Sequence, residues 1–470
     1  MAETLRAELF EQGCRPMAYL KALAQASYPA LLESSLCEGK LGRYSILCWD
    51  PFRRLACRDG TVEVEDFRSG ARWTESGNPF NVLSSEFARH RLAAPGGFEL
   101  PFAGGAVGYF SYDLRHRIER LPRLCHYDLS VPEFILCLYD RALVFDHRTD
   151  LTHFVGHLTP RPPRPAAQNP IQNGVLPDVK GVTLKSNFRR QEYLEAVRRT
   201  KDYIAAGDIF QANLSQRFEG PCAAEGLSIY ERLRAVNPAP FAAYLKYPDF
   251  EIISSSPERF LLVESERVTT RPIKGTRPRL EGDDLFNSRM RRELLGSVKD
   301  HAELAMIVDL ERNDLGRVCR YGTVRVVEHA ALETYPTVYH LVSTVEGLLY
   351  REQYDEFDLI RATFPGGSIT GAPKIRAMEI IEELEPHARS VYTGSLGYIS
   401  FHGRMDLNIV IRTILKTGGR IYMHVGGGIV ADSDPDLEYC ETLHKGKALF
   451  QAVSAANYDE IMAVATANEG

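Results

Sequence analysis

Residues 271–279 read Arg-Pro-Ile-Lys-Gly-Thr-Arg-Pro-Arg, and a β-branched run that predicts a strand leads into them. Pro272 and Pro278 restrict the backbone, and Gly275 permits a sharp turn. Lys274 therefore stands at the tip of a stiff segment. From these residues alone it is either a basic surface side chain or a nucleophile, since a nucleophilic amine must be held in place and partly desolvated.

The composition of the chain excludes several classes of protein. The 470 residues are 44% hydrophobic and 25% charged, a balance typical of a globular protein with a sizeable core. A formal charge of −6 without a polybasic segment argues against nucleic-acid binding. No apolar run approaches the roughly 18 residues that a membrane helix needs, so we expect no contact with a membrane.

The cysteines and the first residues indicate the compartment. The nine cysteines are scattered and include no C-x-x-C pair, which favours free thiols in a reducing environment and argues against structural zinc. The first residues lack the basic and apolar regions of a signal peptide. We therefore expect a cytoplasmic protein.

The pattern along the chain divides it into three regions. Residues 15–155 are predicted to be β-rich, and residues 159–185 are dense in proline and are predicted to be a linker. Residues 188–455 have the strongest pattern. The expected strands lie at 29–34, 43–47, 61–65, 102–110, 134–145, 209–218 and 250–255, and the expected helices at 190–206, 299–310, about 373–384 and after Asp434.

Two of the predicted helices each carry a pair of carboxylates three residues apart. Asp300 and Glu303 lie on one, and Glu438 and Glu441 on the other, with Lys445 on the same face as the second pair. The pairs are either two solvated helix faces or two halves of one divalent-cation site. Because the ligands would be oxygen atoms only, Mg²⁺ is the expected metal.

Glycines and strand residues supply further candidate contacts. Three consecutive glycines within residues 425–430 either offer backbone amides to an oxyanion or pack tightly at a strand end. Asp406, Asn408, Val410 and Arg412 alternate, so a strand would place them on one face, with Arg412 suited to a carboxylate.

Three other stretches allow more than one interpretation. Pro257 fixes the backbone before Glu258, which is either a surface carboxylate or one held at a strand corner. The Gly-rich run 102–110 lacks dinucleotide-loop spacing and indicates close strand packing. Residues 366–374 are a near miss to a phosphate-binding loop, and we do not predict nucleotide binding there.

These motifs together resemble the chorismate-utilising enzymes, which include the anthranilate, isochorismate, salicylate and aminodeoxychorismate synthases. The motifs lie at 254–260, 271–279, 299–317, 365–374 and 426–441. The resemblance implies an α+β fold of two intertwined subdomains, like that of anthranilate synthase component I. Antiparallel sheets would pack as a sandwich with helices outside.

Lys274 indicates the branch within the family. The resemblance implies alanine at this position in anthranilate synthases and lysine in enzymes that aminate chorismate at C4. Gln211 stands where isochorismate and salicylate synthases carry a lysine that activates water, and an amide cannot act as that base. The expected product is therefore 4-amino-4-deoxychorismate, a precursor of para-aminobenzoate and folate.

The resemblance also implies a role for each candidate residue. Lys274 would form a covalent adduct, Glu258 would protonate the leaving hydroxyl, and His340 would lie close to Glu258. Glu303 and Glu441 would bind Mg²⁺, with Asp300 and Glu438 nearby. The expected substrate contacts are Gln211, Thr276, Ser368, Thr370, Tyr392, Arg412, Gly426, Gly427, Gly428 and Lys445.

The same resemblance implies two kinds of partner. No glutaminase pattern is present, so a separate glutamine amidotransferase would supply ammonia. Ser34, Arg43, Tyr44, Pro240 and Phe241 would form a pocket for L-tryptophan, or they are ordinary core residues. The alternatives to the expected activity are an anthranilate synthase large subunit and, in another class, an inactive regulatory or binding subunit.

Overall fold

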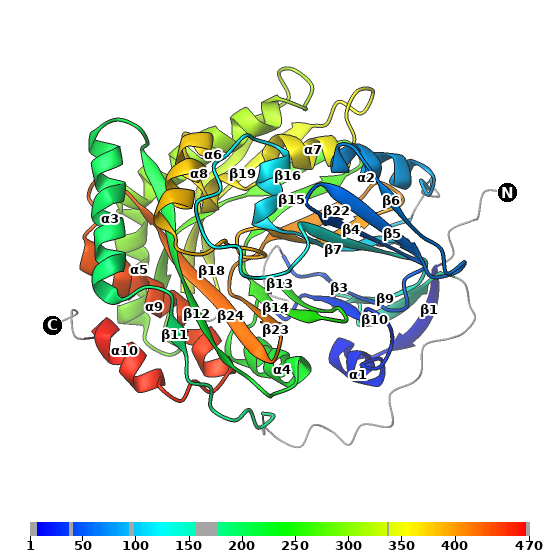
Figure 1. The fold of residues 1–470 in the computed structure, drawn as a ribbon, viewed down its shortest axis with the longest axis horizontal. Helices are drawn as coiled ribbons and strands as arrows, with labels where there is room; N and C mark the ends of the chain where they lie inside the picture. The colour runs from blue at the N-terminus through cyan, green and yellow to red at the C-terminus, as the bar shows by residue number, and fades with distance from the viewer. Residues whose placement is uncertain (1–6, 37–40, 94–97, 157–175, 336–337, 467–470) are drawn as a thin grey trace.

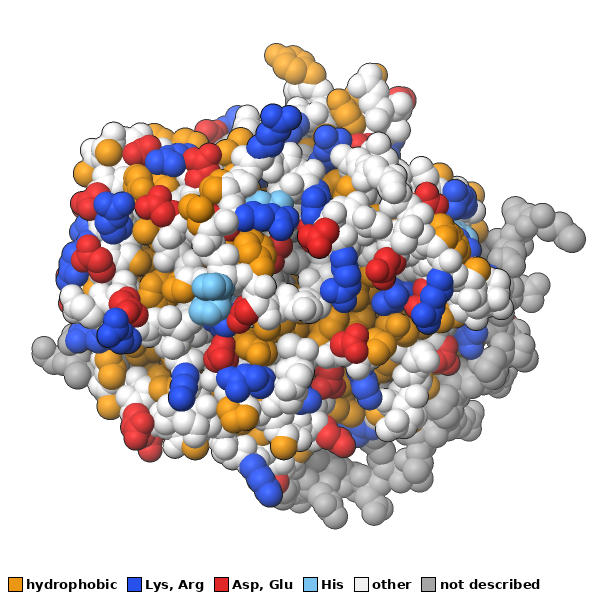
Figure 2. Space-filling model, in the orientation of Figure 1, with side chains coloured by type: hydrophobic (Ala, Val, Ile, Leu, Met, Phe, Trp, Pro, Cys, Tyr) orange, Lys and Arg blue, Asp and Glu red, His pale blue; other side chains and the backbone are white. Residues whose placement is uncertain are grey.

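The computed structural model describes residues 7–36, 41–93, 98–156, 176–335 and 338–466 (Figure 1). Most of the predicted linker, residues 159–175, lies outside these ranges. None of the helices in the described ranges is long and apolar enough to cross a membrane. On the face shown in Figure 2, acidic and basic side chains are interspersed and form no continuous basic stripe.

Two large sheets form the centre of the molecule, each with 12 strands paired in the antiparallel manner that was predicted. The first sheet contains, in spatial order, β1 (Ala7–Gln12), β10 (Leu151–Val155), β9 (Ala142–Asp146), β3 (Tyr44–Cys48), β2 (Ala30–Glu33), β13 (Phe241–Lys246), β14 (Phe250–Ser256), β23 (Thr413–Thr417), β24 (Arg420–Ile429), β12 (Gln211–Pro221) and β11 (Lys185–Ser186), with β20 (Gly371–Ala372) beside β12.

The second sheet contains the remaining strands in the same manner. Its spatial order is β17 (Ile273–Pro278), β19 (Val338–Leu348), β16 (Arg267–Arg271), β15 (Arg259–Glu264), β22 (Met405–Ile409), β21 (Ser395–Ser400), β7 (Gly105–Phe110), β8 (Phe134–Tyr139), β4 (Arg53–Arg58), β5 (Thr61–Asp66) and β6 (Arg72–Glu75), with β18 (Arg325–Thr334) beside β19.

Helices cover the outer sides of the two sheets (Figure 1). They are α1 (Pro16–Ala22), α2 (Pro79–Ala88), α3 (Arg190–Ala205), α4 (Gly226–Val236), α5 (Asp284–Leu295), α6 (Val298–Gly316), α7 (Glu356–Thr363), α8 (Lys374–Leu384), α9 (Pro435–Ala452) and α10 (Tyr458–Thr466), with short 3₁₀ helices η1 (Tyr112–Arg117) and η2 (Gly367–Ile369).

The two halves of the chain are intertwined, as predicted. In the first sheet β2 pairs with β13, and in the second β7 pairs with β21. Close packing explains the glycines of β7, since a Cβ on Gly108 would lie 1.9 Å from the carbonyl oxygen of Ile135. The predicted regions 15–155 and 188–455 each contribute strands to both sheets, so the sheets do not divide the chain between them. The two boundaries therefore stay predictions.

Three large apolar cores hold these layers together, one between the sheets and one between each sheet and its outer helices. A fourth, small cluster joins Ala377 and Ile380 of α8 to Ala212 of β12. In β14, Ile252 faces the core between the sheets, and the next residue, Ile253, faces the outer core. Strands buried on both faces read as continuous apolar runs, which explains the patterns in the sequence.

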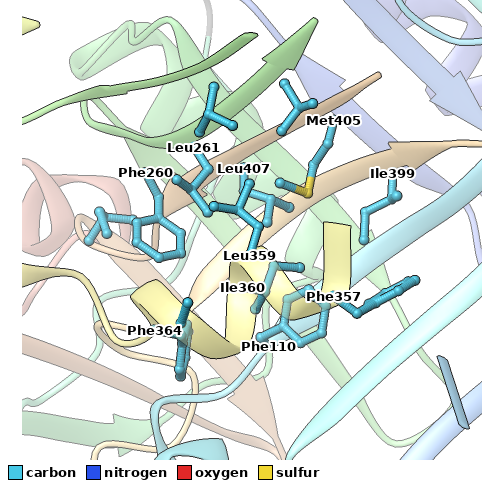
Figure 3. Close-up of a cluster of buried hydrophobic side chains, with 14 of the residues drawn as sticks. Phe110, Phe260, Leu261, Phe357, Leu359, Ile360, Phe364, Ile399, Met405 and Leu407 are labelled. Atoms are coloured by element: carbon cyan, nitrogen blue, oxygen red, sulfur yellow. The ribbon is translucent and has the colours of Figure 1, made fainter. Parts of the chain in front are cut away.

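The outer core of the second sheet shows how the helices are held. Phe357 and Ile360 of α7 pack on Phe110, Met405 and Leu407 of the sheet (Figure 3). Each fully buried side chain of this kind stabilises the fold by roughly 1.5–3 kcal/mol.

One predicted strand is wrong in its extent. The apolar stretch 134–145 forms two strands, β8 and β9, which turn at Asp140–Arg141 and enter different sheets. The two charged residues of the turn interrupt the apolar run, which was wrongly predicted to be one continuous strand. The helix predicted at 373–384 begins one residue later, with Pro373 at its N-cap.

Candidate active site

A cavity of about 960 Å³ lies where strands β12 and β24 of the first sheet meet β17 and β19 of the second, beside α6 and α9. Its size is in the range of small-molecule sites. Most of the predicted site residues line it. They are Glu258, Lys274, Thr276, Asp300, Glu303, His340, Ser368, Tyr392, Arg412, Gly426, Gly428, Glu441 and Lys445.

Four predicted residues do not line this cavity. The hydroxyl of Thr370 donates to the carbonyl of Gly366, so Thr370 holds a turn together. Glu438 is buried and accepts a hydrogen bond from Ser433 at 2.5 Å. Gln211 and Gly427 lie directly behind residues that line the cavity.

The amine of Lys274 lies over the glycine strand. A Cβ added to Gly428 would be 3.3 Å from Nζ of Lys274 and 2.3 Å from Nε2 of Gln211, so only glycine fits between them. Gln211 is fully buried, and neither polar atom of its side chain has a partner in the described part of the chain. Gly275 has φ +76°, but it lies within β17, where the register with β19 shifts between Lys274 and Thr276, so the predicted sharp turn is a bulge in a strand.

Two acid–base candidates lie near this amine. Glu258 is 6% exposed, and burial raises the pKa of its carboxyl, although the Ser368 hydroxyl and the charge of Lys274 act in the opposite direction. Burial also lowers the pKa of His340 to about 4. Nδ1 of His340 lies 2.9 Å from Oγ1 of Thr276 on the paired strand β17.

Arg412 lies in the cavity, but the strand prediction for it is wrong. β22 ends at Ile409, and Arg412 follows in the connection to β23 with φ +53°, where a side chain other than glycine is strained. Its Nη1 donates to the carbonyl of Lys445 at 2.6 Å, and burial lowers the pKa of its guanidinium. Asp406 and Asn408 line a different cavity, so the four residues do not share one face.

A lysine side chain lies between a carboxylate of α6 and a carboxylate of α9. Oε1 of Glu303 is 4.0 Å from Nζ of Lys299, and that amine is 3.8 Å from Oε1 of Glu438. Glu441 pairs with Lys445 at 2.6 Å, and this charge lowers the pKa of Glu441. Asp300 accepts a hydrogen bond from Arg277 at 3.1 Å. Three of the four carboxylates, Asp300, Glu303 and Glu441, therefore line the same cavity.

The donor set is suitable for a hard cation. A Cβ on Gly427 would lie 3.3 Å from Oε2 of Glu438 and 3.8 Å from Oε1 of Glu441, so both oxygens converge over this glycine. Burial raises the pKa of Glu303 and of Glu438, and a neighbouring carboxylate adds to each shift. Among the residues that the structure describes, no three side chains of His, Cys, Asp or Glu form a ready metal-binding group.

Several residues that line the active-site cavity were not predicted from the sequence. Asn213 follows Gln211 on the same face of β12, and His424 precedes Gly426 on the same face of β24, so strand alternation was the available signal. Lys299 stands four residues before Glu303 on α6. Arg277 lies in the same lining and belongs to the motif 271–279, although no role was predicted for it, and His444 and Lys447 belong to no motif.

A second cavity, of about 590 Å³, brings together all five residues predicted for the amino-acid pocket: Ser34, Arg43, Tyr44, Pro240 and Phe241. The hydroxyl of Ser34 contacts the carbonyl oxygens of Tyr44 and Pro240 at 2.9 and 3.1 Å, which joins the two halves of the chain. Arg259 and Asp406, paired at 2.8 Å, form another part of the wall.

Comparisons with known proteins agree with this geometry. The sequence model of the family described as chorismate binding enzyme matches residues 32–451. The chain is 40% identical to aminodeoxychorismate synthase component 1 of Escherichia coli, with 91% of this chain and 93% of that protein covered. It is 42% identical to anthranilate synthase component 1 of Thermus thermophilus, with 93% and 95% covered.

A solved structure is similar as well. The crystal structure of anthranilate synthase component I from Streptococcus pneumoniae matches with a TM-score of 0.76 and 31% identity, over 88% of this chain and 93% of that one.

Proposed function

The chain belongs to the family of chorismate-binding enzymes, and on this basis we propose that it aminates chorismate at C4 to give 4-amino-4-deoxychorismate. The observation that carries the proposal is the placement of Lys274 in the cavity, over Gly428 and beside Glu258 and Glu303. The product would serve the synthesis of para-aminobenzoate and folate. The similarity to aminodeoxychorismate synthase component 1 of E. coli supports the same activity.

The charges of the cavity support an anionic substrate. Chorismate carries two carboxylates, and six cationic side chains face four acidic ones in the lining. These are Lys274, Arg277, Lys299, Arg412, Lys445 and Lys447 against Glu258, Asp300, Glu303 and Glu441. Arg412, Tyr392 and the amides of Gly426–Gly428 would bind the carboxylate of the enolpyruvyl group.

The first chemical step would use Lys274 and Glu258. The neutral amine of Lys274 adds to C2 of the ring, the two conjugated ring double bonds each shift by one position, and the bond from C4 to its hydroxyl breaks. Glu258 donates a proton, so the hydroxyl leaves as water. The raised pKa of Glu258 favours the protonated acid that this step requires.

The second step would replace the lysine by ammonia. Ammonia adds to C4, the two double bonds shift back, and the bond between C2 and the lysine nitrogen breaks. The proton that ammonia loses returns to the carboxylate of Glu258, so the overall exchange is ammonia for water. His340 is neutral above a pH of about 4 and lies within hydrogen-bond distance of Thr276. It would position the part of chorismate that carries the C4 hydroxyl.

Mg²⁺ is the metal that these residues would hold. Glu303 and Glu441 would bind it, with Asp300 and Glu438 nearby, because the donor set is oxygen only and the carboxylate of Glu441 lies beside that of Glu438 over Gly427. When bound, the metal would neutralise the carboxylate on the ring of chorismate. Lys299 and Lys445 now compensate part of this acidic charge.

Ammonia would come from a separate glutamine amidotransferase. The sequence has no pattern of a glutaminase, and the E. coli relative is called component 1, which implies a second component. The isolated chain should therefore form product from chorismate with ammonium but not with glutamine. Product formation from glutamine by the isolated chain would contradict this part of the proposal.

We also propose that the second cavity binds L-tryptophan. Its walls carry both signs of charge beside an aromatic ring: Glu33, Glu99, Glu264 and Asp406 with Arg43, Arg148 and Arg404, and Phe241. A zwitterion with an apolar body suits such a wall. The cavity also contains backbone from both halves of the chain, so an occupant would join them.

The rival activity is that of an anthranilate synthase large subunit, favoured by the 42% identity to such a protein from T. thermophilus. It would release pyruvate, whereas the proposed reaction retains the enolpyruvyl group. Lys274 argues against it. An inactive subunit is the rival from another class, and the buried, unpartnered side chain of Gln211 argues against that, since such groups are costly without a ligand. Chorismate turnover by the isolated chain distinguishes the two classes.

A further inference from the structure

A much smaller cavity shares a wall with the active-site cavity. It has a volume of about 10 Å³, and its lining includes Leu129, Arg389, Val391, Leu415 and the rings of Tyr392 and His424. Both rings also line the active-site cavity. The two rings are stacked, with centroids 5.0 Å apart and planes 11° apart, so they form a partition between the two spaces.

His424 brings an unused polar atom to this partition. It is 6% exposed, and in the described part of the chain its Nε2 has no hydrogen-bond partner. Burial, together with the charges of Arg217 and Arg389, holds the pKa of the imidazole well below its usual range, so the ring is neutral. A buried polar atom without a partner is costly, and a ligand at this place would offset that cost.

The size and the polarity of the small cavity select its occupant. A cavity of about 10 Å³ admits one molecule of the size of water. Leu129, Val391 and Leu415 give it apolar walls, and the cation of Arg389 disfavours ammonium. Neutral ammonia has the right size, and it both donates and accepts hydrogen bonds, so either tautomer of His424 can bind it.

We propose that the small cavity is the entry subsite for ammonia, that the Tyr392–His424 ring pair is the gate between it and the bound chorismate, and that His424 positions the incoming molecule. This inference rests on the proposed amination of chorismate. It adds a route for ammonia that is separate from the part of the active-site wall formed by Arg277, Lys299 and Lys447.

The outer side of the small cavity lies close to the surface. Leu129 is only partly buried and follows Asp128, which holds the buried guanidinium of Arg217 through contacts of 2.7 and 2.8 Å. The same guanidinium lies 5.2 Å from the ring centroid of Tyr422, another residue of the wall. A larger side chain at Leu129 would therefore block the entry of ammonia from the surface without contacting the Tyr392–His424 ring pair.

The test measures KM separately for ammonium and for chorismate at fixed pH, with ammonium chloride as the nitrogen source. Leu129→Trp should raise the KM for ammonium roughly tenfold, the equivalent of about 1.4 kcal/mol, and leave the KM for chorismate unchanged. Leu129→Ala is the matched control and should stay near the wild type. His424→Phe keeps the ring and removes its nitrogens, and should raise the KM for ammonium about fivefold, the loss of one hydrogen bond.

The outcomes separate this inference from the proposed function. If the wild type aminates chorismate and both Leu129→Trp and His424→Phe keep its KM for ammonium, the entry subsite is wrong and the activity stands. A rise in the KM for chorismate alone would make the ring pair a support for the substrate, and would also overturn the inference. If the wild type itself gives no aminated product, the proposed function fails and the ammonia route fails with it.

Discussion

The amine of Lys274 lies 3.9 Å from Oε2 of Glu303, and both side chains are only 13% exposed. The nucleophile proposed for the reaction is therefore paired with a residue proposed to bind the metal. A cation bound at Glu303 would compete with Lys274 for the same carboxylate and favour release of the amine. The two proposals are therefore coupled.

Binding of Mg²⁺ should be measurable without turnover. Adding Mg²⁺ should raise the melting temperature of the wild type, since a ligand at 100 times its Kd stabilises the folded state by about 2.7 kcal/mol. Glu441→Gln should lose most of that shift because it removes one charged ligand. Glu195→Gln, at an exposed residue of α3 that contacts Arg198, is the control and should keep the shift. Equal shifts in all three proteins would contradict the site.

Glu258→Gln tests the general acid. The amide has the same shape but cannot donate the proton, so kcat should fall by roughly 10²–10⁴-fold. Chorismate binding, followed by a spectroscopic titration, should change little. Activity of the wild type should fall as pH rises through the raised pKa of Glu258, because the acid form is lost. A kcat within about twofold of the wild type would contradict the assignment.

The same substitution has a predicted effect on stability. Because burial raises the folded-state pKa of Glu258, this group stabilises the fold at low pH, and that contribution is lost as pH rises through the raised value. Glu258→Gln does not titrate and should be more stable than the wild type above that pH. Urea unfolding at acidic and at neutral pH checks this, and a stability difference that does not change with pH would contradict it.

Arg389 should be among the most costly residues to remove. It is 1% exposed in its side chain, and it donates to Glu385 at 2.7 Å and to the carbonyl oxygens of Asn213 and Ile369 at 2.6 and 3.0 Å. Arg389→Ala leaves these groups unpaired and should cost about 3–5 kcal/mol of unfolding free energy. Arg198→Ala removes an exposed pair and should cost less than about 1 kcal/mol. Similar costs for both in urea unfolding would contradict the burial argument.

L-tryptophan should raise the melting temperature in a concentration-dependent way. Tryptamine lacks the carboxylate and indole-3-propionate lacks the amine, so each should give a smaller shift if both signs of charge in the second cavity are used. Phe241→Ala should weaken the effect because it removes the aromatic wall. The absence of any shift at millimolar L-tryptophan would remove the proposal for this cavity.

The sequence was sufficient for the parts of the site that depend on local spacing. The carboxylate pair of α6 and Glu441 of α9 are visible in a short window and line one cavity in the structure, whereas Glu438 is buried and bonded to Ser433. The antiparallel sandwich came from the family resemblance and is confirmed. Strands such as β14, buried on both faces, give continuous apolar runs that do not by themselves distinguish this fold. The five residues of the second cavity came from resemblance, since no local pattern connects Ser34 with Pro240.

The errors occurred where the chain crosses between sheets. Residues 405–413 look like one alternating strand, but β22 belongs to the second sheet and β23 to the first, so Arg412 turns away from Asp406 between them. The same crossing divides the stretch 134–145. Which sheet a strand enters depends on contacts made far away in the sequence, and no periodicity reports that. The partition made by Tyr392 and His424 also joins residues far apart in the sequence, so no local pattern predicts it.

The proposal as a whole depends on Lys274, and the most direct measurement is mass spectrometry of the products that the chain forms from chorismate, Mg²⁺ and ammonium. The wild type should give 4-amino-4-deoxychorismate with the enolpyruvyl group retained, and Lys274→Ala should give little or none of it. Anthranilate and pyruvate as the products of the wild type, or undiminished formation of the 4-amino product by Lys274→Ala, would contradict the account.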